Sequence, residues 1–285
     1  MALLRDTEAW PLGKASVPGG ACAVVIPARY GSTRYPGKPL ALLRGGSGEA
    51  RPLIRRSWEA ARAGLAEMGM PARLLVATDD PRIAEAVAAF GGEAVLTPPD
   101  CRNGTERCAA LLEALPASVE VVVNWQGDAP LMPPAALAAV VAGLGRDAGA
   151  VMATAALACS AQVHAHLLAD AAAGRVGGTT VVVNGRGRAL YFSKRVLPFA
   201  PAAGHAAVRL HLGLYAYRRA ALAAYAALPP SRLEQEEGLE QLRFFEGEGG
   251  IAVVDLAEPG WPVIELNNPE DAPLIEAVLA QRGIA

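Results

Sequence analysis

The sequence has no excess of charge of either sign. Its 285 residues include 26 Lys and Arg and 28 Asp and Glu, which gives a formal net charge of −2. Proteins that bind nucleic acid or an anionic membrane surface through bulk electrostatics carry a surplus of cationic side chains, so neither partner is indicated. Local clusters of Arg and Lys can still bind a small anion.

Long apolar stretches are also missing. No segment approaches the ~20 apolar residues that a membrane-spanning helix needs. Residues 1–20 carry Arg5, Asp6 and Glu8 and lack the apolar core of a signal peptide. We therefore expect a cytoplasmic protein, with a flexible extension over residues 1–20 and a single domain over residues 21–285.

Cysteine is scarce and scattered, and no two cysteines form a CxxC pair. Four thiols in a chain of this length do not indicate a disulfide scaffold. A metal site at Cys101 and Cys108 would still lack two ligands. Reduced thiols without a chemical role are the simpler interpretation for all four, Cys22, Cys101, Cys108 and Cys159.

Hydrophobic residues, which make up 52% of the chain, are arranged in two kinds of pattern. Short apolar runs predict strands over residues 22–26, 73–77, 93–96, 121–124 and 251–256. Helical spacing or capping residues predict helices over residues 53–68, 81–90 and 106–115, and after Pro269. Strands that alternate with helices indicate an α/β fold with a mostly parallel sheet.

In such a fold, ligands bind outside the carboxyl ends of the strands. We expect the loops after the first, third and fourth strands to converge there. Residues 179–183 and 188–192 predict a hairpin with a tight turn at Asn184 and Gly185. With the alternating segment 209–217, they indicate an antiparallel insert over about 179–217 that forms a lid or substrate platform.

The loop over residues 27–39 combines small residues with the cations Arg29, Arg34 and Lys38. Small residues let backbone amides approach a phosphate, and the cations can neutralise a triphosphate. The alternative is a basic surface loop. The segment is neither GxGxxG nor a Walker loop, which disfavours a dinucleotide enzyme or an ordinary ATPase.

Three further groups of residues have both a functional and a structural interpretation. Asp128, in the turn after the fourth strand, is either a magnesium ligand or a residue that caps local amides. Residues 102–105 either contact a nucleotide or begin a helix, with Asn103 or Thr105 as its cap. His211 and Tyr215 share one face of a strand, where a lone histidine is more often structural.

The motifs together resemble one family, the cytidylyltransferases of 3-deoxy-manno-octulosonate (Kdo), also called CMP-Kdo synthetases. Residues 25–40 read VIPARYGSTRYPGKPL, which is similar to the opening signature of that family. The resemblance continues in the same order to the last helix, through FGGEAVLT (90–97), RNGTER (102–107), VNWQGDAP (123–130), RALYFS (188–193), HLGLYAY (211–217), LEQLR (239–243) and NPED (268–271).

This resemblance implies a Rossmann-like nucleotide-diphosphosugar-transferase fold, usually dimeric. In the family, the anomeric hydroxyl of the sugar attacks the α-phosphate of CTP with magnesium present, and pyrophosphate leaves. Such a reaction needs positioning and charge neutralisation more than a protein nucleophile. It thus implies a homodimer with CTP and an acidic sugar as substrates and Mg²⁺ as cofactor.

The resemblance also implies roles for individual residues. The catalytic residues would be Arg29, Lys38 and Asp128. The nucleotide would be bound by Ala28, Arg29, Gly31, Ser32, Thr33, Arg34, Lys38, Arg102, Asn103, Gly104, Thr105 and Gln126. The sugar would be bound by Gln126, Lys194, His211, Tyr215, Glu240 and Gln241.

The match departs from the family at the second magnesium ligand, where Asn267 occupies the position of an aspartate. Glu265, two residues earlier, would lie on the same face of an extended segment and can substitute. The sequence favours a single magnesium held mainly by CTP, with Asp128 as its principal protein ligand and the amide oxygen of Asn267 as a weak one. Glu265 is the alternative second ligand. Lys194 stands where the family usually has arginine. Lysine keeps the positive charge but lacks the planar fork of donors that arginine presents.

These departures affect the sugar and second-metal end more than the CTP end. Two alternatives therefore stay open. The enzyme would use a related sugar, 8-amino-Kdo or a nonulosonate, or the chain would be a nucleotide-binding regulator that has lost catalysis.

Overall fold

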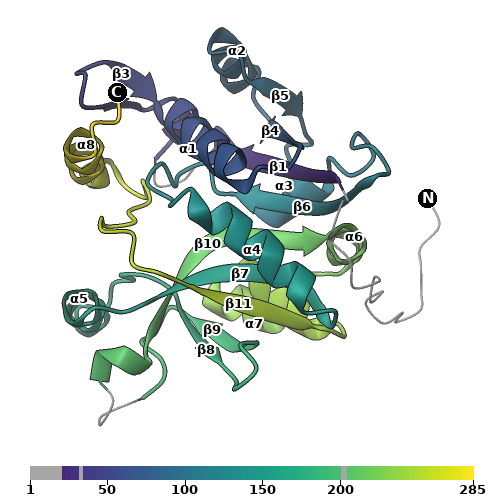
Figure 1. Ribbon diagram of the computed structural model, residues 1–285, viewed down its shortest axis with the longest axis vertical. Helices are drawn as coiled ribbons and strands as arrows, with labels where there is room; N and C mark the ends of the chain where they lie inside the picture. Colours follow the sequence, from purple (N-terminus) through teal and green to yellow (C-terminus); the bar gives the residue numbers. More distant parts are fainter. Residues whose placement is uncertain (1–20, 32–34, 200–203) are drawn as a thin grey trace.

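The computed structural model describes residues 21–31, 35–199 and 204–285. Its centre is a nine-stranded sheet, in which seven strands follow the order β11-β7-β10-β6-β1-β4-β5 (Figure 1). The extension expected over residues 1–20 lies outside the described residues and stays a prediction. The seven strands are β1 (Ala21–Ala28), β4 (Ala72–Thr78), β5 (Glu93–Leu96), β6 (Val119–Trp125), β7 (Ala150–Ala158), β10 (Arg209–Arg218) and β11 (Gly250–Leu256).

Most of the sheet is parallel, as the sequence predicts. β1 runs parallel to β4 and β6, β4 runs parallel to β5, and β7 runs parallel to β11. β10 is antiparallel to both of its central neighbours, β6 and β7. The antiparallel strand is therefore built into the middle of the sheet, where it joins a four-stranded part (β6, β1, β4 and β5) to a two-stranded part (β7 and β11).

Helices cover both faces of this sheet (Figure 1). One face packs against α1 (Leu53–Met68), α2 (Pro81–Ala89) and α4 (Ala135–Arg146). The other packs against α3 (Gly104–Ala109), α6 (Arg219–Ala227) and η3 (Glu240–Glu246). Because the central strands are covered on both faces, their side chains are buried on both, which explains their nearly continuous apolar sequences.

Local signals explain most of the helix boundaries. Asp80 caps α2 through its carboxylate, which accepts a hydrogen bond from the Arg82 N–H at 2.9 Å, and Pro81 is the first helical residue. The helix expected over residues 106–115 begins earlier, at Gly104, and ends at Ala109. Residues 110–115 continue as turns, because Leu111 and Leu112 donate to the third preceding carbonyl.

The expected hairpin is formed by β8 (Thr180–Val183) and β9 (Ala189–Ser193). Its turn is wider than the two-residue turn expected at Asn184 and Gly185. The left-handed residue is Gly187, with φ of 74°. The Asn184 side chain accepts from the N–H of Arg186 and Arg188, so it stabilises a longer loop.

Smaller elements complete the chain. The helix expected after Pro269 is present as η4 and α8, and α8 packs against β2. None of the helices in the described ranges has the length and hydrophobicity that a membrane crossing requires. These elements are η1 (Lys38–Leu40), β2 (Leu42–Arg44), β3 (Ala50–Pro52), α5 (Ala161–Ala172), η2 (Gly204–Ala207), α7 (Arg232–Glu237), η4 (Pro269–Asp271) and α8 (Ala272–Gln281).

Candidate active site

Three loops meet at the carboxyl ends of β1, β5 and β6 and enclose a pocket of about 350 Å³. The convergence that the alternation of strands and helices predicts is therefore confirmed. The first and second loop regions each contribute five lining residues, and in each region two of the five are cations. The lining consists of Pro27, Ala28, Arg29, Lys38, Pro39, Leu53, Cys101, Arg102, Asn103, Gly104, Arg107, Gln126, Gly127 and Asp128.

The first loop is shaped by a turn at Gly37. This residue has φ of 69°, and its N–H donates to the carbonyl of Tyr30 at 3.0 Å. A Cβ on Gly37 would lie 3.2 Å from the Tyr30 ring, so both the backbone and the packing require glycine. The turn places Lys38 at the pocket, where the exposed Arg29 also lies.

Not all of the predicted phosphate-binding residues can be placed. Ser32, Thr33 and Arg34 lie outside the described residues, so their roles stay predictions. Gly31 is exposed and does not belong to the pocket lining.

Lys38 and Asp128 form an ion pair across the pocket. The Lys38 Nζ lies 2.6 Å from Asp128 Oδ2, and both side chains are partly exposed. The turn that carries Asp128 packs tightly on β1, because a Cβ on Gly127 would lie 2.6 Å from the carbonyl oxygen of Pro27. An ammonium beside a carboxylate offers separate partners for a phosphate and for a cation.

The segment that contains Glu265 lies against the Asp128 turn. The N–H of Leu266 donates to the Asp128 carbonyl at 2.9 Å. Burial and the nearby charge of Asp128 raise the pKa of Glu265 to about 7, whereas Lys38 and a hydrogen bond from the Asn267 side chain oppose this shift. The two carboxylates repel each other, and a hard cation bound between them would relieve this repulsion.

The protein donors for such a cation are few. In the described part of the chain, no three His, Cys, Asp and Glu side chains gather as a metal site. Asp128 and Glu265 fit magnesium as carboxylate ligands, and oxygen atoms of a bound substrate would have to complete the coordination. Asn267 contributes through its hydrogen bond to Glu265.

The second loop ends in the cap of α3. The Asn103 side chain accepts from the N–H of Glu106 at 2.8 Å, so the predicted capping role of Asn103 is confirmed. Thr105 is fully buried and its hydroxyl lies 2.8 Å from the Tyr217 hydroxyl. Thr105 is therefore absent from the pocket lining, and a nucleotide could approach its neighbours Arg102, Asn103 and Gly104.

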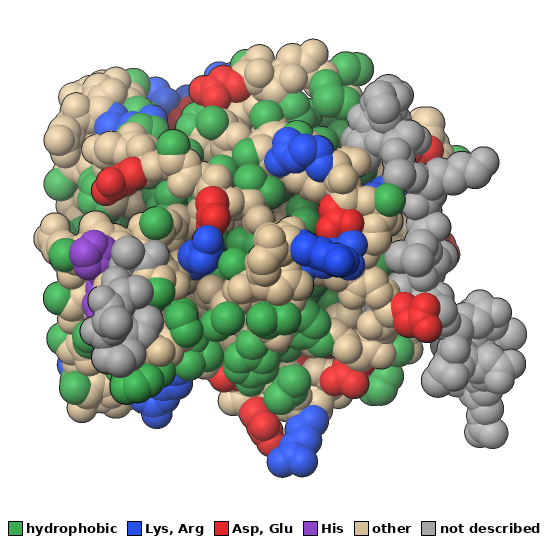
Figure 2. Space-filling model, turned by 60° about the horizontal axis from the view of Figure 1, so that its bottom comes forward, with side chains coloured by type: hydrophobic (Ala, Val, Ile, Leu, Met, Phe, Trp, Pro, Cys, Tyr) green, Lys and Arg blue, Asp and Glu red, His purple; other side chains and the backbone are tan. Residues whose placement is uncertain are grey.

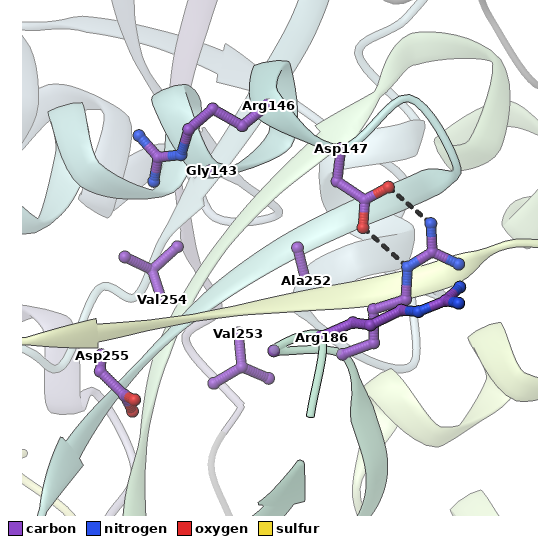
Figure 3. Close-up of a pocket in the computed structure, with 10 residues that line it drawn as sticks. Gly143, Arg146, Asp147, Arg186, Ala252, Val253, Val254 and Asp255 are labelled. Atoms are coloured by element: carbon purple, nitrogen blue, oxygen red, sulfur yellow. Dashed lines mark hydrogen bonds and ion pairs between the residues drawn. The ribbon is translucent and has the colours of Figure 1, made fainter. Parts of the chain in front are cut away.

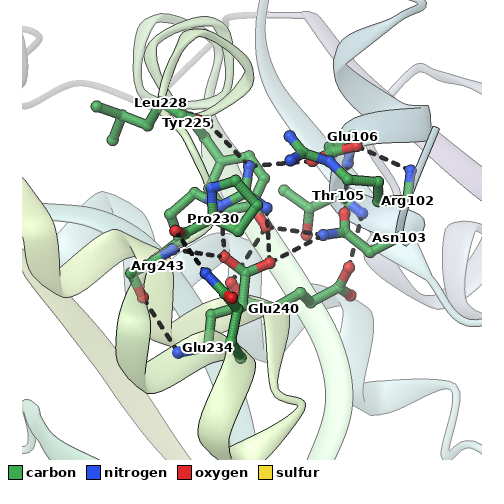
Figure 4. A network of polar contacts seen from close by, with 12 residues as sticks. Arg102, Asn103, Thr105, Glu106, Tyr225, Leu228, Pro230, Glu234, Glu240 and Arg243 are labelled. Carbon is green, nitrogen blue, oxygen red and sulfur yellow. Dashed lines mark hydrogen bonds and ion pairs between the residues drawn. The ribbon is translucent and has the colours of Figure 1, made fainter. Parts of the chain in front are cut away.

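Behind this loop lies a buried polar network that the sequence did not indicate (Figure 4). Arg243, fully buried, donates to both carboxylate oxygens of Glu234 at 2.6 Å and to Glu106 at 3.0 Å. The Asn103 amide donates to Glu234 and to the Tyr225 hydroxyl. The network therefore fixes Asn103 from behind.

Arg107 is another residue of the pocket that sequence reasoning missed. It is almost fully buried, and its guanidinium lies 3.1 Å from Asp79 Oδ2. The other oxygen of Asp79 accepts from the N–H of Tyr30 at 3.3 Å. Arg107 and Asp79 thus join the second loop to the first.

Glu240 connects the pocket to the predicted sugar residues. Its carboxylate accepts from the backbone N–H of Thr105 at 3.0 Å and interacts with the Gln126 side chain. Burial raises the pKa of Glu240, and the hydrogen bonds oppose that shift. Of the six predicted sugar residues, only Gln126 lines the pocket itself.

The other predicted sugar residues lie in a largely buried layer. Gln241 is 3.3 Å from the Tyr215 hydroxyl, and its amide nitrogen has no partner among the described residues. The rings of His211 and Tyr215 are 5.5 Å apart, which confirms that they share one face of β10. Lys194 is held through its backbone N–H, which donates to Glu237 at 3.1 Å.

A second pocket, of about 570 Å³, shares no lining residue with the first (Figure 3). It is formed between the end of α4, the hairpin turn and β11. Asp147 and Arg188 are paired there through two hydrogen bonds, at 2.7 and 2.5 Å, so much of the charge is neutralised internally. The smaller pocket carries the predicted motifs and is the candidate active site.

The chain is similar to proteins of one activity. A family model described as Cytidylyltransferase matches residues 23–251. The 3-deoxy-manno-octulosonate cytidylyltransferase of Maricaulis maris is 46% identical over 261 residues, which are 91% of this chain and 97% of that protein. The Escherichia coli protein of the same name is 38% identical over 260 residues, which are 90% and 96% of the two chains.

Solved structures agree with these relatives. CMP:2-keto-3-deoxy-manno-octonic acid synthetase, solved in complex with CTP, has a TM-score of 0.76 and 36% identity, over 92% of this chain and 99% of that chain. A 4-diphosphocytidyl-2C-methyl-D-erythritol synthase from Anaerococcus prevotii has a TM-score of 0.54 at 14% identity, which shows a shared fold only.

Proposed function

Because the chain belongs to the 3-deoxy-manno-octulosonate cytidylyltransferase family, we propose that the pocket joins CMP from CTP to Kdo and releases pyrophosphate. The chain is a nucleotidyltransferase with CTP and Kdo as substrates. The observation that carries the proposal is the meeting of Lys38 with Asp128 at the point where three loops converge.

The reaction forms one bond and breaks one bond at phosphorus. The anomeric hydroxyl oxygen of the sugar attacks the α-phosphorus of CTP and loses its proton to water. The bond between the α-phosphorus and the oxygen that bridges to the β-phosphate breaks, so that pyrophosphate leaves with that oxygen. Arg29 and Lys38 supply positive charge for the triphosphate and for the pyrophosphate that leaves. Both line the pocket, where they can act without a protein nucleophile.

The nucleoside end of CTP is assigned to the second and third loops. Ala28, Arg102, Asn103, Gly104 and Gln126 line that part of the pocket. The polar network behind Asn103 restricts its side chain, which reduces the entropy lost on binding. A Cβ on Gly104 would lie 3.1 Å from the Asn124 amide and 3.2 Å from Pro27, so the close approach of these loops depends on glycine.

Magnesium fits Asp128, which lines the pocket, and Glu265, whose segment lies against the Asp128 turn. Asp128 would be its principal protein ligand and Glu265 a second one, since Asn267 is neutral and bonds to Glu265. When bound, the ion would polarise phosphate oxygens and neutralise their charge. Lys38, paired with Asp128, would then be free to turn toward phosphate.

The sugar is assigned to the layer that begins at Gln126. Glu240 interacts with Gln126, and its sequence neighbour Gln241 bonds to Tyr215, whose ring lies beside that of His211. Lys194 supplies the cation expected for the sugar carboxylate. Ser193 and Lys194 are both anchored on Glu237.

The homodimer is supported by one face of the molecule. Figure 2 shows hydrophobic side chains gathered on the end that lies at the bottom of Figure 1. Leu190 on β9 and Phe199 after it are 57% and 91% exposed. Burial of these side chains by a second copy would remove an apolar surface from water.

A sugar panel tests the function. Pyrophosphate release is measured with CTP, magnesium and Kdo, 8-amino-Kdo or a nonulosonate in turn. We expect the highest kcat/KM with Kdo. A higher value with 8-amino-Kdo or a nonulosonate would show that the enzyme uses that related sugar instead. CTP binding without release from any sugar would select the regulator. Calorimetry with CTP, UTP, ATP and GTP completes the test, and tighter binding of ATP or GTP would contradict the proposal.

A further inference from the structure

Strand β10 contains an irregularity beside the active site. Opposite β7, Leu212 pairs with Ala155 and Tyr215 pairs with the next residue, Thr154. Gly213 and Leu214 are therefore extra residues on β10, and the ladder is interrupted there. A Cβ on Gly213 would lie 3.1 Å from the Gln126 side chain and 3.3 Å from Glu265 Oε1, so the bulge faces the pocket's third loop and the metal side.

The hydroxyl of Thr154 fills this interruption. Thr154 is fully buried, and its Oγ1 lies 2.8 Å from the Leu214 carbonyl oxygen and 3.3 Å from the Leu212 carbonyl oxygen. The same oxygen lies 2.9 Å from Nε2 of His211. A hydroxyl has a single proton to donate, and a carbonyl can only accept. Donation to Leu214 leaves the Thr154 oxygen as an acceptor, so His211 must donate its Nε2–H.

The surroundings of His211 disfavour the protonated, charged form of its ring. The ring lies between Phe192, at a centroid distance of 4.9 Å, and Tyr215, at 5.5 Å. Burial lowers the pKa of His211 to about 3, so the imidazole is neutral at ordinary pH. A neutral ring with its proton on Nε2 presents Nδ1 as an acceptor. No donor among the described residues bonds to Nδ1.

We propose that Thr154 is a positioning residue for the sugar: it holds His211 as the Nε2–H tautomer, so that Nδ1 accepts a hydrogen bond from a sugar hydroxyl. The proposal rests on the proposed function, because it assigns His211 to the sugar. It predicts that the hydroxyl of Thr154 affects recognition of the sugar and leaves recognition of CTP nearly unchanged. A purely structural Thr154 would affect both substrates alike.

The tautomer can be measured without any substrate. The chain has four histidines, so long-range ¹H–¹⁵N correlation of the ¹⁵N-labelled protein resolves each ring, and His211→Gln identifies the signals of His211. We expect His211 in the Nε2–H form in the wild type and in Thr154→Ser. A wild-type ring in the Nδ1–H form, or a charged ring at pH 7, would overturn the proposal.

Kinetics then test the role in catalysis. Thr154→Val removes the hydroxyl at nearly constant shape, and Thr154→Ser keeps it. We expect Thr154→Val to raise KM for Kdo about tenfold, the loss of roughly one hydrogen bond, with KM for CTP within about twofold. Thr154→Ser should stay within about threefold of the wild type for both substrates.

Equal rises in both KM values for Thr154→Val, unchanged KM for Kdo, or failure of Thr154→Ser to preserve it would each contradict the proposal. If Thr154→Val does not fold, Thr154→Ala provides the same deletion with less crowding. A wild-type protein that releases no pyrophosphate with Kdo would contradict the proposed function, and the tautomer measurement would still decide the Thr154–His211 relationship.

Discussion

The Nζ of Lys38 lies 2.6 Å from Oδ2 of Asp128, so the cation of the first loop and the carboxylate of the third loop neutralise each other. The two residues are 90 positions apart in the sequence. Binding of a nucleotide and a cation would exchange this internal pair for two external ones, which keeps the charges of the site balanced before and after binding.

Lys38→Ala should lower kcat by ~10²-fold or more, because a preorganised donor to the triphosphate is lost. The melting temperature should change little, since a partly exposed ion pair contributes only about 0–1 kcal/mol. Steady-state pyrophosphate release and thermal unfolding check both expectations. Arg146→Ala, at the second pocket, is the matched control and should retain activity. Full activity in Lys38→Ala would exclude the residue from the site.

Asp128→Asn should abolish activity at ordinary magnesium and recover little at high magnesium or with manganese. The amide keeps the shape of the side chain and loses the charge that a hard cation requires. Activity is measured across a metal titration with CTP held constant. Asp255→Asn, which changes an exposed carboxylate at the end of β11, should behave as the wild type. A normal metal dependence in Asp128→Asn would refute its assignment as the ligand.

Glu265 and Asn267 test how the second carboxylate acts. The sequence favoured a magnesium held mainly by CTP, but the placement of Glu265 near Asp128 supports the alternative in which Glu265 is a ligand. Glu265→Gln should then lower activity at limiting magnesium by ~10-fold or more. Asn267→Asp should help little, because it replaces a hydrogen bond to Glu265 with a repelling charge.

A magnesium titration of these two variants separates the alternatives. Mild effects in Glu265→Gln, together with tighter apparent magnesium binding in Asn267→Asp, would instead show that CTP holds most of the coordination of the magnesium and that Glu265 is not a ligand. Glu270→Gln, an exposed residue of η4, is the control.

His211 makes the free energy of unfolding depend on pH. Its pKa is lowered to about 3 in the folded protein, against the ordinary value of 6.5 for histidine, so the unfolded chain binds a proton that the folded chain excludes. This contribution to stability is complete above pH 6.5 and is lost as pH falls toward 3. Between pH 7 and pH 5 the loss should be about 2 kcal/mol.

Urea unfolding of the wild type and of His211→Gln at pH 5, 6 and 7 measures this loss. The variant retains the carboxylates that also titrate, so the difference between the two proteins isolates His211. Parallel pH dependences would show that His211 titrates normally in the folded protein.

The loops of the site could be predicted because their signals are local. The loop that carries Gly37 and Lys38 begins directly after a buried apolar run, and Asp80 with Pro81 marks the start of a helix by capping chemistry alone. The order of strands and helices then placed the first, second and third loops at one edge, by a rule that depends only on the parallel sheet.

Contacts between distant segments could not be predicted in this way. Arg243 meets Glu106 across 137 residues, and its sequence neighbours give no sign of the partner. Residues 150–158 form a buried strand in which alanine is frequent, so neither a period of two nor a helical period is apparent. The position of β10 between β6 and β7 is also a contact between distant segments, and only the structure shows it.

The central position of β10 has a consequence for how the chain reaches its native state. β6 and β7 are consecutive strands of the main sheet in the sequence. β6 can pair with β1 on one edge, but its other edge has no partner, and β7 has no partner at all, until residues 209–218 have been synthesised and inserted between them. Until then both strands expose unpaired edges, which are sites of aggregation during synthesis. Closure of the sheet is therefore a late, long-range event, and substitutions in β10 should slow refolding more than equally destabilising substitutions in α2.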